Sequence, residues 1–579
     1  MNRLTIITLL SLFSLTAQGQ TKENSQKTVR QVVITVDSML NAQQKVTAHM
    51  KTDDYDGAIG IKLRGNSSLG FNQKKYTLEL RDSLGKEIEA PLLGMPAHSD
   101  WVLLAPYSDV SAVRDPLAFQ LWRDMGHWAP RTQMVELTLN GDYRGIYIFT
   151  EAIKRGDHRV NISKLKKSDV AGRDVTGGYI LRIDTFNDDD ATFPSKVPGI
   201  GEGNMMSQII WSCIYPKKKK LQPEQLTYIE QFVDSVEMTI QSDYFADPER
   251  GYAHFIDVPS FVDYFIHTEL SLNADGYKRS AYFYKEKLHA DGTGGKLVAG
   301  PVWDYNLAYG NANFANANKI DAWCFEGASN NPTPALWQRL LQDPAFRKAV
   351  KVRYKALRKG VLSNKAINAY IDRYAQLLAP CIARHFETFP ELLVSEEEKE
   401  KASTSSPFGF PPMGGGFPPM PGGGFPPMGG GDGFPPMPGG FQIPDSIPQF
   451  PGGFPPMGGG FATMPEGFQM PDSIPQFPGG FPPMGGGFQM PEGFQMPEGF
   501  QMPEGFQMPD FGGFNAASMF AAYRVSSYEE EIQILKQWLA DRLSFLDRNI
   551  ERFDKDWLPR IQEPKEIKTP PFNGFPFMR

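Results

Sequence analysis

Residues 269–313 read ELSLNADGYKRSAYFYKEKLHADGTGGKLVAGPVWDYNLAYGNAN, and two aspartates stand out in this stretch. Asp275 follows Asn273, with one residue between them, and Asp304 precedes Asn306 in the same way. A carboxylate beside an amide side chain is typical of two different features: a site that handles protons and metal ions, and an Asx turn that ends a strand. The local pattern leaves both interpretations open.

The residues between these two aspartates predict a β-hairpin. Two β-rich runs, at 281–284 and 296–302, flank the sequence DGTGG at 291–295. Because a hairpin brings its two ends together, we expect both carboxylates to face one cleft. One carboxylate as a base and a second at the end of a buried strand is the arrangement that phosphoryl transfer requires.

Upstream, two further runs predict strands joined by a loop rich in Gly, Ser and Asn. The runs are residues 57–64 (GAIGIKLR) and 75–80 (KYTLEL), and the loop is residues 65–73. Alternation in the second run places Lys75 on its polar face, beside the loop. A lysine at such a position reaches bound phosphates; the commoner alternative is an ordinary solvated strand lysine.

The order of elements indicates an α+β fold. Residues 32–36 predict a strand, residues 109–125 a helix that begins near 114–116, and residues 133–150 a hairpin around an Asn-Gly-Asp turn. This order is that of a kinase-like small lobe, although many α+β domains share it. A further strand is predicted at 177–185, and helices at 222–239, 258–272 and over most of 331–386.

The N-terminus predicts an exported protein. Residues 1–19 combine Arg3, a short apolar run and a small-residue cleavage site, which is the pattern of a secretory signal peptide. The apolar run is too short to span a membrane, and no other stretch is expected to do so. Residues 20–30 are polar and predict a flexible mature N-terminus.

Composition argues against several classes of protein. Three cysteines far apart along the chain of 579 residues do not predict a disulfide framework or a zinc site. The formal charge of −7 argues against a nucleic-acid partner. This charge is unevenly distributed: between Lys401 and Arg524 there is no Lys or Arg, and eight acidic residues there contribute −8, which leaves +1 for the remainder.

Residues 403–514 form a low-complexity segment of recurring units such as FPPMGGG and MPEGFQ. The block at 441–461 recurs at 468–488 with a single change. Pro and Gly at this density exclude helix and disfavour sheet, so we expect disorder with extended character. The regular Phe and Met side chains predict an adhesive segment.

A helix is predicted after this segment. Residues 527–530 (SYEE) match a capping box, and apolar side chains then follow along one helical face. A single amphipathic helix cannot bury its apolar face by itself. We therefore expect it to pack on the part before the repeat, which makes the low-complexity segment an insertion within one domain.

Several short motifs occur in order along the chain. They are RGNSS at 64–68, KKYTLEL at 74–80, LGM at 93–95, DWVLL at 100–104, VRD at 113–115, LNGDYRGIY at 139–147, GGYI at 177–180, NAD at 273–275, GPVWDYN at 300–306 and LKQW at 535–538. With these motifs the chain resembles the CotH (spore coat protein H) family of atypical, secreted protein kinases.

The resemblance implies a reduced protein-kinase-like fold of the α+β class with two lobes, a β-rich N-terminal lobe and a mainly α C-terminal lobe. The expected segments are a signal peptide at 1–19, a flexible N-terminus at 20–30, the main part of the kinase-like domain at 31–400, a disordered low-complexity insertion at 401–523, a closing helix at 524–558 and a flexible tail at 559–579.

The resemblance also implies transfer of the γ-phosphoryl group of ATP, with Mg²⁺ or Mn²⁺, to Ser or Thr of exported or surface proteins. Asp275 matches the catalytic aspartate that accepts the hydroxyl proton. Asp304 matches the metal-binding aspartate, with Asn306 as a further metal ligand. Lys75, with Lys74 as its rival, matches the lysine that binds the nucleotide phosphates.

Arg64 is expected to add a second positive contact, and Glu151 falls where a hinge residue or a partner of the lysine would lie. Two departures from the kinase pattern keep an alternative open. Ser280 stands where a typical kinase has Asn as its second metal ligand, and no Gly-x-Gly-x-x-Gly loop occurs in the N-terminal region. The alternative is a catalytically weak or inactive scaffold that acts at the cell surface or matrix through its Phe/Met/Pro repeat.

Overall fold

The computed structural model describes residues 26–185, 190–201, 206–328, 331–398 and 521–553. The expected signal peptide, nearly all of the expected insertion and the expected C-terminal tail lie outside these residues. Helices and strands are mixed along the described part, so the fold is of the α+β class, as predicted.

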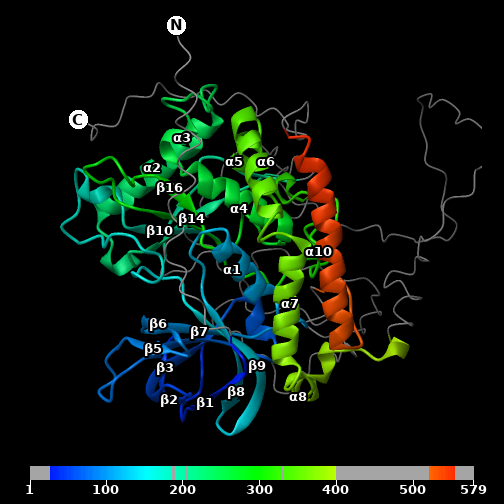
Figure 1. Ribbon diagram of the computed structural model, residues 1–579. Helices are drawn as coiled ribbons and strands as arrows, with labels where there is room; N and C mark the ends of the chain where they lie inside the picture. Colours follow the sequence, from blue (N-terminus) through cyan, green and yellow to red (C-terminus); the bar gives the residue numbers. More distant parts are fainter. Residues whose placement is uncertain (1–25, 186–189, 202–205, 329–330, 399–520, 554–579) are drawn as a thin grey trace, which may run out of the picture. The chain divides into compact units, whose positions relative to one another are not determined.

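Seven strands of the N-terminal part close into a barrel in the order β1-β2-β3-β4-β7-β9-β8. Neighbouring strands are antiparallel except β1 and β8, which pair in parallel and complete the circle. The barrel is drawn in blue to cyan in Figure 1. Its strands are β1 (Arg30–Thr35), β2 (Val46–Lys51), β3 (Asp56–Arg64), β4 (Lys75–Leu80), β7 (Asp100–Leu104), β8 (Thr132–Leu139) and β9 (Asp142–Glu151), and a separate hairpin is formed by β5 (Ala90–Leu92) and β6 (Met95–His98).

The interior of the barrel is filled by alternate residues of its strands. In β4, Tyr76, Leu78 and Leu80 are buried, whereas Lys75 and the other intervening residues are half-buried. The buried residues join those of β1, β3 and β8 in one hydrophobic cluster. The alternation predicted for residues 75–80 therefore has the expected effect, and it directs Lys75 away from the barrel interior.

The second part of the chain contains more strand than predicted. A five-stranded antiparallel sheet has the order β11-β14-β10-β15-β16. The strands are β10 (Tyr179–Ile183), β11 (Ala191–Pro194), β14 (Ile210–Tyr215), β15 (Ala281–Lys285) and β16 (Leu297–Ala299), and a small sheet is formed by β12 (Gly199–Ile200), β13 (Met206–Ser207) and β17 (Thr333–Pro334). The expected hairpin is confirmed, because β15 and β16 pair with Phe283 opposite Ala299.

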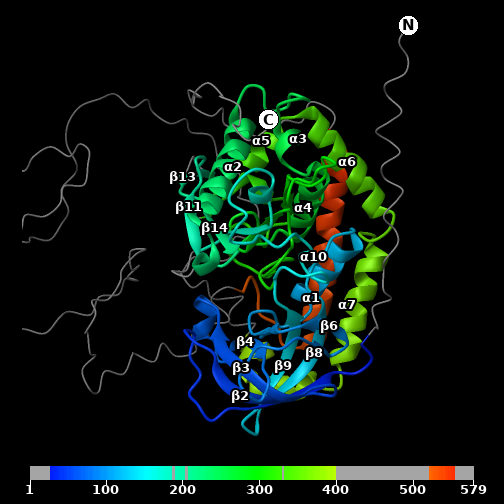
Figure 2. The same ribbon diagram turned by 90° about the vertical axis from the view of Figure 1, so that its left-hand side faces the viewer.

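Helices surround this sheet and extend to the barrel (Figures 1 and 2). Contacts join α4 to β16, α6 and α10, α1 to α4 and α7, and α8 to β9 of the barrel. The helices are α1 (Arg114–Asp124), α2 (Pro223–Gln241), α3 (Tyr252–Phe255), α4 (Val258–Ser271), α5 (Leu336–Leu340), α6 (Pro344–Arg358), α7 (Asn364–Leu378), α8 (Ile382–Thr388) and α10 (Tyr528–Ile550).

Helix α10 begins at the predicted capping box. The Ser527 hydroxyl accepts a hydrogen bond from the Glu530 backbone N–H at 3.1 Å. The Glu530 carboxylate accepts from the N–H of Ser526, one residue earlier than the motif predicts. The apolar face of the helix packs against α4, α6 and α7, and Leu535, Leu539 and Leu543 belong to the main hydrophobic core.

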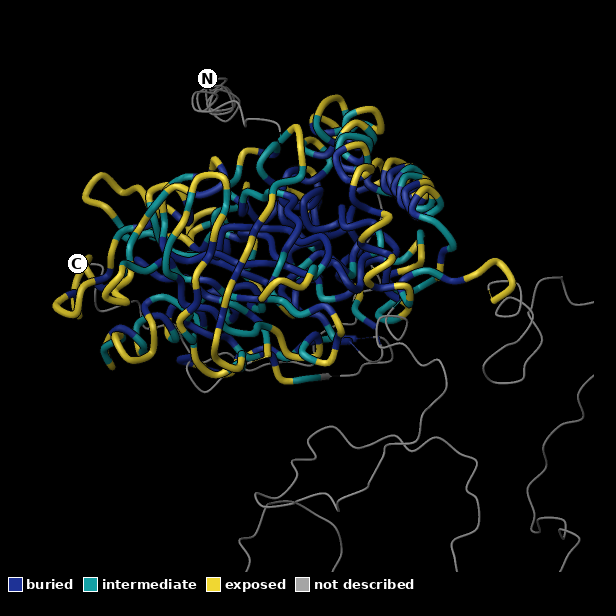
Figure 3. The backbone as a smooth tube through the Cα atoms, turned by 90° about the horizontal axis from the view of Figure 1, so that it is seen from below, coloured by how far each residue is buried: buried dark blue, intermediate teal, exposed yellow. Residues whose placement is uncertain are grey.

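Buried residues gather in the middle of the described part, and exposed residues lie mainly in its loops (Figure 3). The three cysteines, Cys213, Cys324 and Cys381, are free and buried. None of the helices that the structure describes combines the length and apolar character needed to span a membrane.

Candidate active site

Asp275 lies in the turn that follows α4, and Asp304 lies in the loop that follows β16. Asn273 connects the two. Its side-chain carbonyl accepts from the Asp275 N–H at 3.3 Å, and its amide nitrogen donates to the Asp304 carbonyl at 3.2 Å. The structure thus brings together the two aspartates that the hairpin pattern pairs.

The backbone on both sides of the hairpin is strained. Five non-glycine residues between 272 and 309 have a positive φ: Leu272 (42°), Tyr277 (69°), Ser280 (48°), Asp304 (64°) and Tyr309 (52°). Each such residue costs about 1–3 kcal/mol and persists only where surrounding contacts hold it, and such residues cluster at functional sites. Asp304 is itself one of them.

Two cations of the barrel contact the segment 303–304. The Lys75 Nζ lies 3.7 Å from Asp304 Oδ1. Arg64 is the cross-strand partner of Lys75 in β3, and its guanidinium stacks 5.3 Å above the ring of Trp303, the residue before Asp304. The barrel therefore contributes positive charge, and the loop after β16 contributes the negative charge of Asp304.

Lys74 and Lys75, the two candidate phosphate-binding lysines, have different partners in the structure. The Lys74 Nζ donates to the Leu69 carbonyl at 2.7 Å, within the loop that precedes β4. Lys74 thereby fastens the Gly/Ser/Asn loop to β4, whereas Lys75 reaches Asp304.

Two further carboxylates, Asp115 and Asp184, interact with the charge of Asp304 and were not predicted from the sequence. Together with Asp275 and Asp304 they form a cluster of carboxylates. Asp115, in the first turn of α1, accepts from the Tyr305 N–H at 2.6 Å. Burial, followed by the charge of Asp304, raises the pKa of Asp115 to about 7. The motif VRD at 113–115 contains this residue, but nothing in the local pattern shows that α1 begins beside Asp304.

Asp184 follows β10 and lies opposite the start of β15. The Ser280 hydroxyl donates to its Oδ2 at 3.5 Å, and Arg182 Nη1 lies 3.5 Å from the same oxygen. Burial raises the pKa of Asp184; Arg182 opposes this shift and Asp304 adds to it. The signal in the sequence was a carboxylate at the end of the predicted strand 177–185.

Asp275 is placed to exchange a proton near neutral pH. Burial, followed by the charge of Asp304, raises its pKa to about 6, while Arg279 and Lys278 act in the opposite direction. The Arg279 Nη1 lies 3.9 Å from Asp275 Oδ1. A base works best when its pKa is close to the working pH, so this environment suits Asp275 to accept a proton.

Glu151 lies elsewhere. It is fully buried at the end of β9, where its carboxylate pairs with Arg131 at 2.6 Å and with Arg159 at 3.9 Å. The structure therefore does not bring it to Lys75. Glu151 is the last residue of β9, the last strand of the barrel along the chain.

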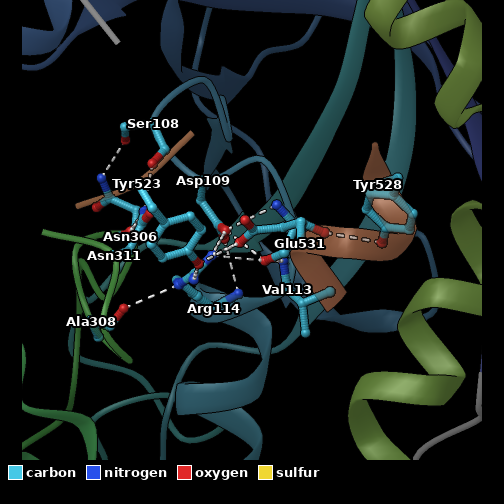
Figure 4. A network of polar contacts seen from close by, with 11 residues as sticks. Ser108, Asp109, Val113, Arg114, Asn306, Ala308, Asn311, Tyr523, Tyr528 and Glu531 are labelled. Carbon is cyan, nitrogen blue, oxygen red and sulfur yellow. Dashed lines mark hydrogen bonds and ion pairs between the residues drawn. The ribbon is translucent and has the colours of Figure 1, made fainter. Parts of the chain in front are cut away.

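Asn306 is next to the cluster but belongs to another network (Figure 4). Its side-chain nitrogen donates to the Ser108 hydroxyl at 2.7 Å, and its backbone carbonyl accepts from the Asn311 side chain at 2.7 Å. These bonds fix the loop two residues beyond Asp304.

The site is expected to hold a divalent cation through Asp304. No group of three or more His, Cys, Asp or Glu side chains in the described ranges is arranged to hold a metal ion. Mg²⁺ at phosphoryl-transfer sites is bound through one or two carboxylates together with substrate phosphates and water, so a single accessible carboxylate is sufficient. The Asp304 side chain is 32% exposed and meets this requirement.

The family model described as CotH kinase protein matches residues 61–405, which is more than half of the chain and includes Lys75, Asp275 and Asp304. The chain belongs to this family. Membership supports a kinase-like function that uses ATP and a divalent metal in general terms. No curated protein matches the chain.

Proposed function

We propose that the protein is an exported protein kinase that transfers the γ-phosphoryl group of ATP to Ser or Thr of exported or surface proteins. One observation carries the proposal: Lys75 of the barrel meets Asp304 at 3.7 Å, beside Asp275. A cation for phosphates, a carboxylate for metal and a carboxylate for the proton are the parts that phosphoryl transfer needs.

In this proposal the barrel is the N-terminal lobe and the helix-rich remainder is the C-terminal lobe of a reduced kinase fold. Lys75 and Arg64 come from the barrel, and Asp275 and Asp304 come from the loops on either side of the β15–β16 hairpin. The nucleotide would bind between the two groups.

The residues divide the chemistry among them. Lys75 and Arg64 bind and orient phosphate oxygens. Asp304 would hold Mg²⁺ or Mn²⁺, with the side-chain oxygen of Asn306 as a further ligand, because the bond to Ser108 uses the Asn306 nitrogen. A bound ion would neutralise part of the phosphate charge. Asp275 accepts the proton of the acceptor hydroxyl while the hydroxyl oxygen forms a bond to the γ-phosphorus. The bond between the γ-phosphorus and the bridging oxygen breaks, and its electron pair leaves with ADP.

Residues 1–19 support action outside the cytoplasm, because their pattern is that of a signal peptide. The acceptor proteins in this proposal are accordingly proteins that are exported or displayed on the surface.

A second candidate function is that of a weak or inactive kinase-like scaffold. Ser280 favours it, because this residue stands where a second metal ligand is expected and its hydroxyl donates to Asp184. In that case the repeat at 403–514 would carry the function as an adhesive segment.

The proposal is tested by incubating the purified protein with γ-labelled ATP, Mg²⁺ or Mn²⁺, and casein as a general acceptor. Asp275→Asn is expected to lower transfer by about 10²–10⁴-fold because the base is lost, while nucleotide binding is kept. Asp304→Asn is expected to lose both transfer and metal-dependent nucleotide binding.

The matched control is Asp291→Asn, an exposed aspartate in the turn of the same hairpin, which should behave as the wild type. Equal labelling by the wild type and both site variants would refute the kinase assignment. A wild type that binds nucleotide without transferring phosphate would favour the scaffold.

A further inference from the structure

The first described residues after the low-complexity segment lie against the loop that carries Asp304. Ala521 forms a β-bridge with Ala312, and the Ala522 N–H donates to the Asn311 carbonyl at 3.2 Å. We call residues 521–525 the return segment and residues 304–312 the Asp304 loop. The return segment therefore touches the proposed metal-binding loop directly.

The buried side chain of Arg114 joins the same parts (Figure 4). It donates to the Ala308 carbonyl of the Asp304 loop at 3.1 Å and to the Tyr523 hydroxyl of the return segment at 2.7 Å. It also pairs with Asp109 at 2.5 Å and with Glu531 of α10 at 2.6 Å. All three guanidinium nitrogens are thus used.

The next residue of α1 holds the other end of the loop. Asp115 accepts from the Tyr305 N–H, so adjacent residues at the start of α1 fix Tyr305 and Ala308. Since Asp304 has a φ of +64°, a conformation that neighbours must maintain, these contacts bear on the orientation of its carboxylate.

The chain before the low-complexity segment contacts the barrel side of the site. The Glu391 carboxylate accepts from the Asn72 side chain at 2.7 Å and from the Tyr107 hydroxyl at 2.6 Å. Asn72 belongs to the loop 65–73 between β3 and β4, which carries Arg64 and Lys75 at its two ends.

The segments before and after residues 399–520 also contact each other. The Val394 N–H donates to the Val525 carbonyl at 3.0 Å, and Arg524 donates to the Glu391 carbonyl at 3.4 Å. One junction, made of residues 389–394 and the return segment, thereby touches both loops that supply the proposed site.

We propose that this junction positions the Asp304 loop against the loop 65–73 and so sets the separation of Lys75 and Asp304. Arg114, Tyr523 and Glu391 are positioning residues in this arrangement and act through the loops that they hold. The inference rests on the proposed function for its consequence in catalysis, but its structural content can be measured separately.

Hydrogen exchange of the backbone amides tests it directly. Tyr523→Phe removes the hydroxyl that accepts from Arg114 and donates to Glu531 at 3.2 Å. Amides of residues 305–311 should then exchange at least about fivefold faster, because the loss of a single hydrogen bond already corresponds to about that factor. Tyr244→Phe, a half-buried tyrosine that stacks with Arg250, is the matched control and should exchange as the wild type does.

Glu391→Ala tests the barrel side, because it removes the acceptor of the bonds from Asn72 and Tyr107. It should raise exchange in the loop 65–73, whereas Glu387→Ala, at an exposed position of α8, should not. Unchanged exchange in both loops would overturn the proposal. So would an equal increase in α7, because that result would mean general destabilisation.

Nucleotide affinity separates this inference from the proposed function. With a non-hydrolysable ATP analogue and Mg²⁺, Tyr523→Phe should bind about fivefold more weakly than the wild type. A wild type that binds no nucleotide would refute the proposed function, and the exchange measurement would still decide on the junction.

Discussion

Asp275 and Asp304 have the same type of side chain, but their surroundings differ. The Asp275 side chain is 16% exposed and its pKa is raised to about 6, whereas the Asp304 side chain is 32% exposed and faces Lys75. A carboxylate with a raised pKa suits proton transfer. An accessible carboxylate suits a metal ion, and the lysine beside it suits phosphate. Environment distinguishes the proposed roles.

His267 links α4 to the Asp304 loop and should make stability depend on pH. Its Nε2–H donates to the Ala118 carbonyl at 2.9 Å, and its Nδ1 accepts from the Tyr305 hydroxyl at 3.2 Å. Burial lowers its pKa from 6.5 to about 4. Between these values the unfolded chain binds the proton more strongly, so stability is lost as pH falls, by up to about 3 kcal/mol.

Urea unfolding at pH 7 and pH 4.5 measures this effect. His267→Gln should show a smaller loss of unfolding free energy between the two pH values than the wild type. His49→Gln, on an exposed side chain that pairs with Asp56, should retain the wild-type difference. Equal pH dependence of the wild type and His267→Gln would contradict the assignment.

At the scale of the element, α10 depends on one buried arginine. Arg542 donates to the Glu269 carbonyl at 2.6 and 2.9 Å and to the Ile320 and Ala322 carbonyls at 2.7 and 2.6 Å. Its guanidinium also lies 3.5 Å from the Glu269 carboxylate. Glu269 is near the end of α4, shortly before Asp275.

Arg542→Met should therefore lower the unfolding free energy by about 3–5 kcal/mol, because it leaves a buried carboxylate and several carbonyls without this partner. The comparison is Arg548→Met on the same helix, whose exposed side chain bonds Ser544 and should change stability by about 0.5 kcal/mol or less. Denaturant titration measures both. Similar losses in the two variants would argue against a structural role of Arg542.

Elements with a strong local pattern were predictable. The strand at 75–80 has the predicted bounds because its alternation is regular, and α1 begins where Pro116 indicates. The run 100–104 (DWVLL), which forms β7, is buried throughout and has no alternation. Such a run does not identify itself as a strand from its pattern.

Within the site, proximity along the chain decided what could be foreseen. Asp275 and Asp304 flank one hairpin, so their meeting follows from local rules. Asp115 and Asp184 arrive from α1 and β10, and only the tertiary fold brings them to the cluster. Glu151 was associated with the site by its position in the order of elements, and that order says nothing about which cation it pairs with.

At the scale of the molecule, long-range pairing determines the fold. Parallel pairing of β1 with β8 closes the barrel across about a hundred residues of chain, and no local pattern signals it. The five-stranded sheet likewise joins strands from distant segments. A mainly helical second part was expected from the helical spacing of its apolar residues, and most of its strands were missed because they are short and widely separated.

Deletion of residues 403–514 tests whether the repeat is an insertion. The connection between Val394 and Val525 becomes roughly sevenfold shorter, which lowers the free-energy cost of loop closure by about 1–2 kcal/mol. The shortened protein should therefore unfold cooperatively, at a temperature at least as high as that of the wild type. Calorimetry measures this directly. Loss of a cooperative transition would show that the repeat contributes to the fold.

The hydrogen bond between Val394 and Val525 also makes this position suitable for protein engineering. The Val394 nitrogen and the Val525 carbonyl oxygen are 3.0 Å apart, so the chain leaves and re-enters the domain at neighbouring points. A guest protein whose own termini are neighbours would match this insertion point. A circularly permuted fluorescent protein spliced there would sit beside both loops of the candidate site. Its emission would provide an optical sensor of nucleotide occupancy in the intact protein.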